Sequence, residues 1–393
     1  MRILHVTPYM HPRAGGPPVV VENFVRETRK LGHLPEIIST PLYCDGDQST
    51  LLQRLNELAP TTFLPGWRSF DVLQRLARRQ LAASIRSAEI VHVHTLWNPI
   101  NIVVRRECAR HQRPYVLMPH GMLDPYSLTI RRWRKAFYLW AMERRNLSNA
   151  QRLIYTTPEE VRLATMELSS LPRAVVIPLG GDAPCGNCYD LASAFFDRFP
   201  RARGRRQLLF FGRLHFKKGL DRILAILPSV VRVCPDVLLT IVGDGSPKFV
   251  TLLNRIISAQ RLERNVLMTG RLEGAMKWGA YASAELFVLP SRQENFAITV
   301  AEAMQMGIPV IISNKVNTWP HVKEAGAGLI VDDGGIEVEL EKALLSLLRD
   351  GAGARLMGRR GQEYARRNLT WTRATTCLMK CYDEVVAGWR RAY

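Results

Sequence analysis

The sequence has few acidic residues, no long apolar run and no regular cysteine pattern. No apolar run reaches the roughly 18 to 20 residues that a bilayer-spanning helix needs, so we expect no transmembrane segment. The first nine residues enter a strand pattern directly, without the basic start, apolar stretch and cleavage site of a signal peptide. These absences argue against export and predict a cytoplasmic protein.

Acidic residues are outnumbered, with 35 Asp and Glu against 54 Lys and Arg, which gives a formal net charge of +19. A strongly basic balance indicates a polyanionic partner, which includes a phosphorylated ligand, an acidic membrane surface and a nucleic acid. The charge does not choose among these three classes.

The seven cysteines are odd in number and scattered, which is typical of a reducing compartment. Cys185 and Cys188 form one CxxC without a second pair at zinc-finger spacing. His92 and His94 alternate along a predicted strand and share one face, but no third ligand is evident at a suitable spacing. We therefore expect no metal site.

The length of 393 residues and the hydrophobic content of 47% indicate two hydrophobic cores. Short apolar runs alternate with amphipathic segments throughout, the pattern of an α/β protein with doubly wound parallel sheets. The strands are expected at Ile3 to Val6, Glu36 to Ser39, Ile90 to Val93, Tyr115 to Met118, Leu153 to Tyr155, Val175 to Ile177, Leu208 to Phe211, Leu238 to Val242, Val266 to Met268, Leu286 to Leu289, Val310 to Ile312 and Leu329 to Val331.

The rhythm of strands and helices breaks once, where glycine, proline and arginine cluster. We expect an N-terminal Rossmann-like domain over 1–180, a linker over 181–206 and a C-terminal Rossmann-like domain over 207–370. The amphipathic segment 371–393 is expected to form a helix that packs back across both domains.

Three glycine-containing turns follow predicted strands, where open parallel sheets bind their ligands. Gly15 and Gly16 precede a helix whose first turn holds prolines, and Gly243 lies in a tight turn. In the third turn, Gly212 and Gly219 bracket Arg213, Lys217 and Lys218. Arginine and lysine together suit a diphosphate, and because two glycines bracket the charges we favour this over the alternative of a solvated basic loop.

The most specific run extends from Pro290 to Met304 and contains Glu294 and Glu302. It resembles the Glu-x7-Glu motif of glycosyltransferase family 4. The Gly-Gly loop, the cationic turn and the Val-Gly-Asp-Gly turn follow that family's order, and the resemblance spans nearly the whole chain, including Pro119 to Pro125. It implies the GT-B architecture, with two Rossmann-like domains facing a cleft, and a retaining transfer from a nucleotide-diphosphate sugar. The cationic turn and the lack of a credible metal site predict that this transfer needs no metal.

The resemblance also implies roles for particular residues. Glu294 would hold hydroxyls of the donor sugar, His120 would line the sugar pocket, and Arg213 with Lys218 would hold the diphosphate. The remaining donor-binding positions implied in this way are Gly15, Gly16, Gly243, Arg271, Asn295, Phe296, Ala297 and Glu302, of which Glu302 would bind the ribose hydroxyls.

The sequence departs from the family pattern beside the sugar. Asn295 and Ala297 stand where many members have glycine, and 314–317 replaces a common glycine-rich stretch. The donor sugar therefore cannot be inferred from the resemblance. Asp45-Gly46-Asp47 resembles the metal motif of the other main glycosyltransferase fold, but its polar surroundings indicate a turn.

The spacing of the two glutamates gives an independent argument. Eight residues of continuous helix would separate Glu294 from Glu302 by about 12 Å along the axis. The carboxyl groups of glycoside hydrolases are roughly 5 to 9.5 Å apart, so a paired acid and base is disfavoured. Both carboxylates suit one elongated ligand instead.

Three function classes stay open. A glycosyltransferase accounts for the two domains, the cationic turn and the glutamates, and would act on a glycan or lipid-linked acceptor. The family resemblance suggests bacterial surface polysaccharide synthesis as its pathway. A sugar-nucleotide epimerase or a phosphorylase would share the fold. A non-enzymatic polyanion-binding protein is the third class; binding of nucleic acid is not expected, because basic and aromatic residues interleave only near 131–145.

The segment 128–146 combines aromatic and basic residues. On a helix, Ile130, Trp133, Phe137 and Trp140 fall near one face, while the basic residues and Tyr138 fall toward another. Two interpretations stay open. The aromatic face either lies on the anionic inner surface of the cytoplasmic membrane, or packs on the sheet of the first domain.

Overall fold

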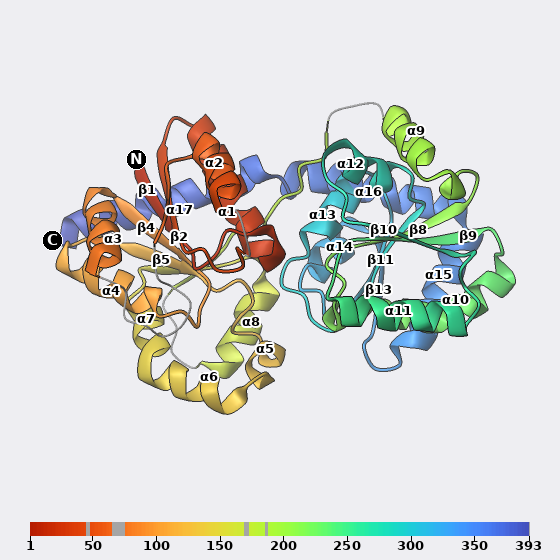
Figure 1. The fold of residues 1–393 in the computed structure, drawn as a ribbon, viewed down its shortest axis with the longest axis horizontal. Coiled ribbons are helices and arrows are strands. Elements are labelled where there is room, and N and C mark those ends of the chain that lie inside the picture. The colour runs from red at the N-terminus through yellow and green to blue at the C-terminus, as the bar shows by residue number, and fades with distance from the viewer. Residues whose placement is uncertain (45–47, 65–74, 169–172, 185–187, 393) are drawn as a thin grey trace. The chain divides into compact units, whose positions relative to one another are not determined.

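The computed structural model describes residues 1–44, 48–64, 75–168, 173–184 and 188–392. The chain forms two compact units, one of Met1–Leu179 with Trp371–Tyr393 and one of Gly180–Thr370 (Figure 1). Each unit carries its own parallel sheet, so the expected α/β class with two doubly wound sheets is confirmed.

In the described residues of the first unit, seven parallel strands lie in the order β3-β2-β1-β4-β5-β6-β7. The chain runs outward in both directions from the neighbouring strands β1 and β4, which makes their carboxyl ends the switch point of this sheet. The strands are β1 (Arg2–Val6), β2 (Leu34–Ser39), β3 (Thr61–Phe63), β4 (Ile90–His94), β5 (Tyr115–Met118), β6 (Arg152–Tyr155) and β7 (Ala174–Val176).

Helices connect these strands because their apolar residues recur with helical periodicity. They are η1 (Pro12–Ala14), α1 (Gly16–Lys30), α2 (Gln48–Leu58), α3 (Arg75–Ser87), α4 (Ile100–Arg110), α5 (Pro125–Thr129), α6 (Arg132–Tyr138), the π-helical turn η2 (Leu139–Glu143), α7 (Arg144–Ser148), α8 (Pro158–Glu167) and α17 (Trp371–Ala392). Helix α17 packs against α1, where Trp371 meets Phe24 edge-on at 5.8 Å between ring centroids.

In the second unit, six parallel strands lie in the order β10-β9-β8-β11-β12-β13, with the switch point between β8 and β11. The strands are β8 (Arg206–Phe211), β9 (Val237–Val242), β10 (Val266–Gly270), β11 (Leu286–Leu289), β12 (Val310–Ser313) and β13 (Gly328–Val331). The helices are α9 (Cys188–Arg198), η3 (Pro200–Ala202), η4 (Phe216–Lys218), α10 (Leu220–Val233), α11 (Pro247–Ala259), α12 (Gly274–Ala282), α13 (Ile298–Gln305), α14 (Trp319–Ala325), α15 (Ile336–Arg349) and α16 (Gly351–Asn368).

The segment expected to be a linker, 181–206, belongs to the second unit instead. Helix α9 packs on α12 so closely that a Cβ at Gly279 would lie 2.6 Å from the carbonyl oxygen of Leu191. The side chain of Arg205 donates to the carbonyl oxygens of Asp236 and Val237. The glycines and prolines indicated a loop, but the apolar face of α9 and these arginine contacts fix the segment.

Candidate functional site

Most of the predicted donor-binding residues lie in the second unit, at the carboxyl ends of its strands. Arg213 and Lys218 follow β8, Gly243 follows β9, and Arg271 follows β10. Glu294 to Ala297 lie between β11 and α13, and Glu302 lies on α13 itself. This is the edge at which open parallel sheets bind ligands.

The backbone and the carboxylate of Glu294 are both held in place. Its N–H donates to the carbonyl oxygen of Lys315 at 2.9 Å, and its own carbonyl oxygen accepts from the N–H of Asn317 at 3.1 Å. Its carboxylate forms an ion pair with the ammonium group of Lys218. Both side chains are about four-fifths buried, so the structure brings together two residues that the sequence only placed on separate turns.

Glu302 is more deeply buried, with 6% of its side chain exposed. Its carboxylate accepts from the ammonium group of Lys277 at 2.5 Å and from the hydroxyl of Tyr281 at 2.9 Å. Burial, and then the charge of Glu302, raise the pKa of Tyr281 well above its usual value. The phenol therefore stays a hydrogen-bond donor to the carboxylate.

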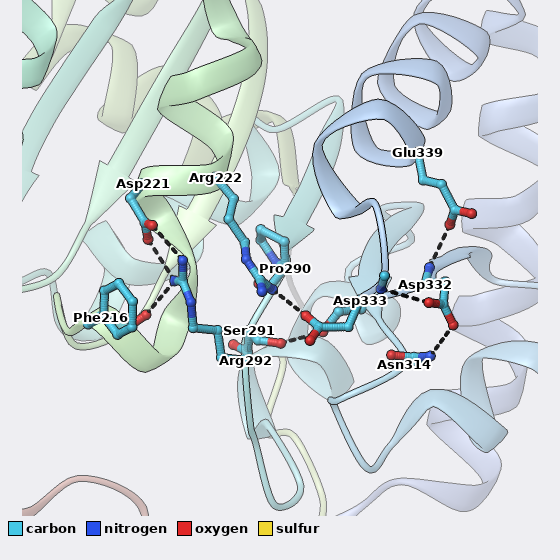
Figure 2. A network of polar contacts seen from close by, with 12 residues as sticks. Phe216, Asp221, Arg222, Pro290, Ser291, Arg292, Asn314, Asp332, Asp333 and Glu339 are labelled. Carbon is cyan, nitrogen blue, oxygen red and sulfur yellow. Dashed lines mark hydrogen bonds and ion pairs between the residues drawn. The ribbon is translucent and has the colours of Figure 1, made fainter. Parts of the chain in front are cut away.

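A network of arginines fixes the turn after β8 against the turn after β11 (Figure 2). The guanidinium of Arg292 donates to both carboxylate oxygens of Asp221 at 2.8 and 2.7 Å, and lies 3.8 Å from the ring centroid of Phe216. Arg222 donates to the carbonyl oxygen of Pro290 at 3.0 Å and pairs with Asp333 at 2.7 Å. The two turns that carry Lys218 and Glu294 are therefore preorganised.

The turn after β8 is strongly positive. The guanidinium of Arg213 is exposed and has no hydrogen-bond or ion-pair partner in the described part of the chain. His215 lies beside it, and partial burial followed by the charges of Arg213, Lys217 and Lys218 lowers the pKa of His215. A cluster that disfavours a further positive charge is suited to an anionic ligand.

The segment 295–297 leads into α13 without a side-chain cap. Ala297 has a φ of 56°, in the left-handed region where glycine is the usual residue, and only 8% of it is exposed. The buried Phe296 packs beside His321, with ring centroids 6.4 Å apart. The first N–H groups of α13 thus follow directly on the segment that we expected to contact the sugar.

Gly243 and Arg271 have structural explanations beside the predicted one. A Cβ at Gly243 would lie 1.9 Å from the carbonyl oxygen of Gly212, so the neighbouring turn requires glycine there. Arg271 pairs with Glu273 at 2.7 Å, and both side chains are largely exposed. Their roles in donor binding stay predictions.

In the first unit, Gly15 and Gly16 follow β1 and begin α1. Gly15 has a φ of 94°, and a Cβ on either glycine would have no neighbour within 4 Å. His120 follows β5 with a φ of 55°, and its partly exposed ring is bonded to a buried ring, Nε2 lying 3.1 Å from Nδ1 of His94. Glu160 fixes this loop by accepting from the N–H of Gly121 at 2.7 Å.

The sequence suggested no third residue beside His92 and His94, but the structure brings His5 of β1 against them. All three rings are buried, and a ligand atom from each lies within 4.8 Å of the others. The rings of His92 and His94 are stacked at 4.0 Å between centroids. Imidazole lone pairs lie in the ring plane, so stacked rings do not converge well on one ion. The Asp45-Gly46-Asp47 motif and Cys185 lie outside the described residues.

Comparison with protein families matches both halves of the chain. Residues 15–180 match the family model described as Glycosyl transferase 4-like domain, and residues 193–365 match Glycosyl transferases group 1. The chain belongs to the family 4 glycosyltransferases.

Relatives of this family 4 glycosyltransferase with assigned activities include three bacterial proteins. A GDP-mannose-dependent alpha-mannosyltransferase of Mycolicibacterium smegmatis is 33% identical over 37% of this chain and 36% of its own length. A D-inositol 3-phosphate glycosyltransferase of Segniliparus rotundus is 28% identical over 62% and 54%. The chain thus spans about a third to a half of these two relatives. The GDP-mannose:cellobiosyl-diphosphopolyprenol alpha-mannosyltransferase of Xanthomonas campestris is 25% identical over 90% and 89%.

Solved structures share the fold. The Anabaena protein Alr3699/HepE, in complex with UDP and glucose, has a TM-score of 0.78 at 18% identity and covers 98% of this chain and 99% of its own. A sucrose-phosphate synthase from Thermosynechococcus elongatus has a TM-score of 0.73 at 18% identity, with coverages of 99% and 100%. These matches confirm the GT-B fold of the family.

Sequence reasoning missed several residues of this glycosyltransferase site. Lys277 and Tyr281 are four residues apart on α12, and this spacing puts both side chains on one face of the helix. No pattern in the sequence indicates that this face contacts Glu302. Asp221 and Arg292 are 71 residues apart, and His5 is 89 residues from His94. Pairs on different elements leave no spacing signal in a single sequence.

Proposed function

We propose that this chain is a retaining glycosyltransferase that moves a sugar from a nucleotide-diphosphate sugar to a glycan or lipid-linked acceptor. The observation that carries the proposal is the arrangement around α13. Two carboxylates, one in the connection before α13 and one on α13 itself, are each paired with a lysine, Glu294 with Lys218 and Glu302 with Lys277. Lys218 belongs to the cationic turn that ends in Gly219.

Each group has a defined task in the proposed donor complex. Glu302 accepts hydrogen bonds from the ribose hydroxyls while Lys277 and Tyr281 keep its carboxylate oriented. Glu294 accepts from hydroxyls of the sugar. The ammonium group of Lys218 has three donors, so it can bind a phosphate oxygen without leaving Glu294.

Transfer breaks the bond between the anomeric carbon and the diphosphate oxygen, and the bonding electrons leave with that oxygen. Arg213, Lys218 and the first N–H groups of α13 then stabilise the developing charge, in the role that a divalent ion has in other enzymes. The acceptor oxygen forms the new bond on the face that the diphosphate leaves, and its proton passes to the departing diphosphate oxygen. His120 lines the sugar pocket in this proposal.

A transfer assay with UDP-, GDP- and ADP-sugars tests the function, preceded by a thermal-shift screen, because a bound donor raises the apparent stability with its concentration. We expect one nucleotide class to stabilise the protein and transfer to require an acceptor. Conversion of one nucleotide sugar into another without an acceptor would identify an epimerase. A requirement for free phosphate would identify a phosphorylase. An inverted product anomer contradicts retention. Activity that EDTA abolishes and Mg²⁺ or Mn²⁺ restores contradicts metal independence.

We further propose that the segment 130–140 docks on an anionic bilayer that holds a lipid-linked acceptor. The residues of its predicted apolar face are not packed on the sheet, which was the alternative interpretation: Ile130, Trp133, Phe137 and Trp140 are 48%, 85%, 65% and 71% exposed. Arg131, Arg132 and Arg134 beside them are also exposed. Exposed aromatic and basic side chains on one short stretch complement the interface of an anionic membrane.

Two residues of this stretch face inward rather than outward. Lys135 donates to the carbonyl oxygen of Ser127 and lies 5.6 Å from the ring centroid of Trp97. Tyr138 meets the same indole edge-on at 6.3 Å. Lys135 and Tyr138 therefore hold the helix on the unit, which leaves the three arginines for lipid phosphates.

Sedimentation with phosphatidylglycerol vesicles tests the docking proposal. Among the described residues no helix has the length and apolar character to span a bilayer, so binding should be peripheral and reversible by salt. Replacing Arg131, Arg132 and Arg134 with Ser should weaken binding by about 1 kcal/mol each. Replacing the exposed Arg359, Arg360 and Arg366 of α16 is the matched control. If both triple variants lose the same amount of vesicle binding, net charge alone explains the binding and the docking proposal is wrong.

We also propose that the protein lies at the cytoplasmic face of the inner membrane and acts in surface polysaccharide synthesis. The proposed docking surface and the proposed lipid-linked acceptor support this location. Fractionation of cells that express the wild type and the three-arginine variant tests this location, with a shift to the soluble fraction expected for the variant.

A further inference from the structure

Three imidazole rings form a hydrogen-bonded chain that leads from the buried sheet to His120. Nδ1 of His5 lies 3.0 Å from Nε2 of His94, and Nδ1 of His94 lies 3.1 Å from Nε2 of His120. His5 is on β1 and His94 on β4, the two strands at the switch point of the first sheet. His5 and His94 are fully buried, and His120 is partly exposed.

Each ring of this chain is neutral, because burial lowers the pKa of His5 and of His120 to about 3 and that of His94 well below its usual value. A neutral imidazole carries one N–H and one lone pair. Two hydrogen bonds in series therefore allow two arrangements. All three rings carry the proton on Nδ1, or all three carry it on Nε2.

The buried end of the chain distinguishes the two arrangements. Nε2 of His5 is buried and has no hydrogen-bond partner among the described residues. Protons on Nε2 would leave an orphaned N–H there, whereas protons on Nδ1 leave a lone pair. Buried N–H groups without a partner are rarer in proteins than under-satisfied acceptors. The Nδ1 arrangement is favoured.

We propose that His94, backed by His5, is a positioning residue that holds His120 in the tautomer with its proton on Nδ1. Nε2 of His120 is occupied by His94, and Nδ1 has no partner in the described structure, so Nδ1–H is the group that His120 offers to a ligand. The ligand class is a carbohydrate oxygen that accepts a hydrogen bond. This last step rests on the proposed glycosyltransferase function.

The tautomer limits what His120 does in the reaction. With its proton on Nδ1 and its Nε2 lone pair bonded to His94, the ring has no free lone pair with which to take a proton from an acceptor hydroxyl. His120 therefore donates a hydrogen bond to the sugar and does not act as a general base. The hydrogen bond from Gly121 to Glu160 keeps the loop in the required position.

Nitrogen-15 NMR of histidine-labelled full-length protein tests the proposal without substrate, because long-range couplings distinguish the two tautomers. His120, assigned with a His120→Asn variant, should have its proton on Nδ1. A neutral histidine side chain in water prefers the tautomer with its proton on Nε2, so this result is not the default. A His120 spectrum with the proton on Nε2, or a protonated ring at neutral pH, would overturn the proposal.

Two variants of equal size test the role of His94. In His94→Asn the side-chain amide still donates to Nε2 of His120, so the tautomer and transfer should be kept. In His94→Asp the carboxylate only accepts, so at about pH 9 His120 should carry its proton on Nε2. Its kcat should fall about tenfold below that of His94→Asn, the factor that one ordinary hydrogen bond contributes.

His92→Asn is the matched control. His92 lies on the same strand and face, stacks on His94, and bonds to the hydroxyl of Tyr382 at 2.6 Å, but it donates to no ring of the chain. It should lose stability and keep the tautomer of His120. The proposal is wrong if His120 keeps the wild-type tautomer in His94→Asp. It is also wrong if the kcat of His94→Asp falls no further than that of His92→Asn. A wild type with the expected tautomer but no transferase activity would contradict the proposed function alone.

Discussion

The carboxylates of Glu294 and Glu302 are held by different kinds of contact. Within the described residues the carboxylate of Glu294 has one partner, Lys218, which lies on the turn proposed to bind the diphosphate. Glu302 has two partners on α12 and is nearly inaccessible. The two partners of Glu302 fix one orientation of its carboxylate, which suits the ribose that every donor has in common. The carboxylate of Glu294, with a single partner among the described residues, can adjust to the sugar.

Substitution of the two glutamates should separate binding from transfer. Glu302→Ala should weaken binding of the bare nucleoside diphosphate by about 10- to 100-fold, because it removes charge-assisted hydrogen bonds and leaves Lys277 without its carboxylate. Glu294→Ala should leave that binding nearly unchanged and abolish transfer, since we assign it to the sugar. Titration calorimetry with the nucleotide, beside a transfer assay, measures both. Loss of nucleotide binding in Glu294→Ala but not in Glu302→Ala would reverse the roles.

Glu143 of the first unit is a buried carboxyl group whose pKa is raised. It is fully buried in the π-helical turn η2, where it accepts from the N–H of Trp97 at 2.9 Å and from the amide of Asn146 at 3.2 Å. Burial raises its pKa to about 7, and the hydrogen bonds oppose this shift without cancelling it. The residue follows the exposed aromatic segment and was not singled out by the sequence.

The raised pKa makes the stability of the first unit depend on pH. The unfolded chain loses this proton near pH 4.5 and the folded protein near pH 7, so the free energy of unfolding should fall as pH rises between these values. The slope should approach about 1.4 kcal/mol per pH unit. Glu143→Gln, which does not titrate, should remove this contribution. Urea unfolding at several pH values measures the difference.

Glu384 is an exposed residue of α17, and the Glu384→Gln variant controls for the loss of one negative charge. If the stability difference between the wild type and Glu143→Gln stays constant from about pH 5 to about 7.5, Glu143 does not change its protonation over that window, and the assignment is wrong.

At the level of elements, buried parallel strands were predictable because they read as short apolar runs, and all twelve expected strands are present in the structure. The three-residue edge strand β3 was missed, since its threonines are only half-buried. Helix α9 was taken for a linker because the surrounding glycines and prolines dominated its composition. The site residues on strand-end turns were found by their motifs, but the contacts among them depend on tertiary packing that no local pattern records.

The turn after β8 owes its position to a close approach between elements. Gly219 has a φ of 70°, and a Cβ there would lie 2.1 Å from the carbonyl oxygen of Pro290. Gly219→Ala should therefore push the cationic turn away from the β11 turn, destabilise the second unit by about 2 kcal/mol or more, and weaken nucleotide binding. Thermal unfolding and calorimetry measure the two effects.

Gly204→Ala provides the control for this prediction. Gly204 has nearly the same φ, 72°, but a Cβ there would meet nothing within 4 Å. Both alanines cost the strain of a left-handed backbone, so the difference between the variants isolates the contact with Pro290. Equal destabilisation, with equal nucleotide binding, would show that the close approach has no consequence.

At the scale of the whole molecule, the two units are built differently along the chain. The first needs two separate segments, because α17 of the C-terminus packs on α1 and places Tyr382 against His92. The second is one continuous segment whose ends meet, since the N–H of Gly181 donates to the carbonyl oxygen of Leu369 at 3.1 Å and Gly181 pairs with Thr370. A continuous segment with its own sheet and closed ends is expected to fold alone.

The fragment 180–370 should therefore fold cooperatively and bind the nucleoside diphosphate by itself. It contains Arg213, Lys218, Glu294 and Glu302 together with the partners that orient them, so we expect its dissociation constant to lie within about tenfold of that of the full chain, a difference of about 1.4 kcal/mol. If His120 and Gly16 of the first unit supply sugar contacts beside that of Glu294, the fragment should gain less affinity from the sugar of the complete donor than the full chain does, and it should not catalyse transfer. Calorimetry on the fragment, on its Glu302→Ala variant and on the full chain compares these affinities, and circular dichroism with thermal unfolding establishes that each is folded.

A folded fragment that fails to bind a nucleotide bound by the full chain would show that the first unit supplies essential nucleotide contacts. The assignment of the donor site to the second unit would then have to be abandoned.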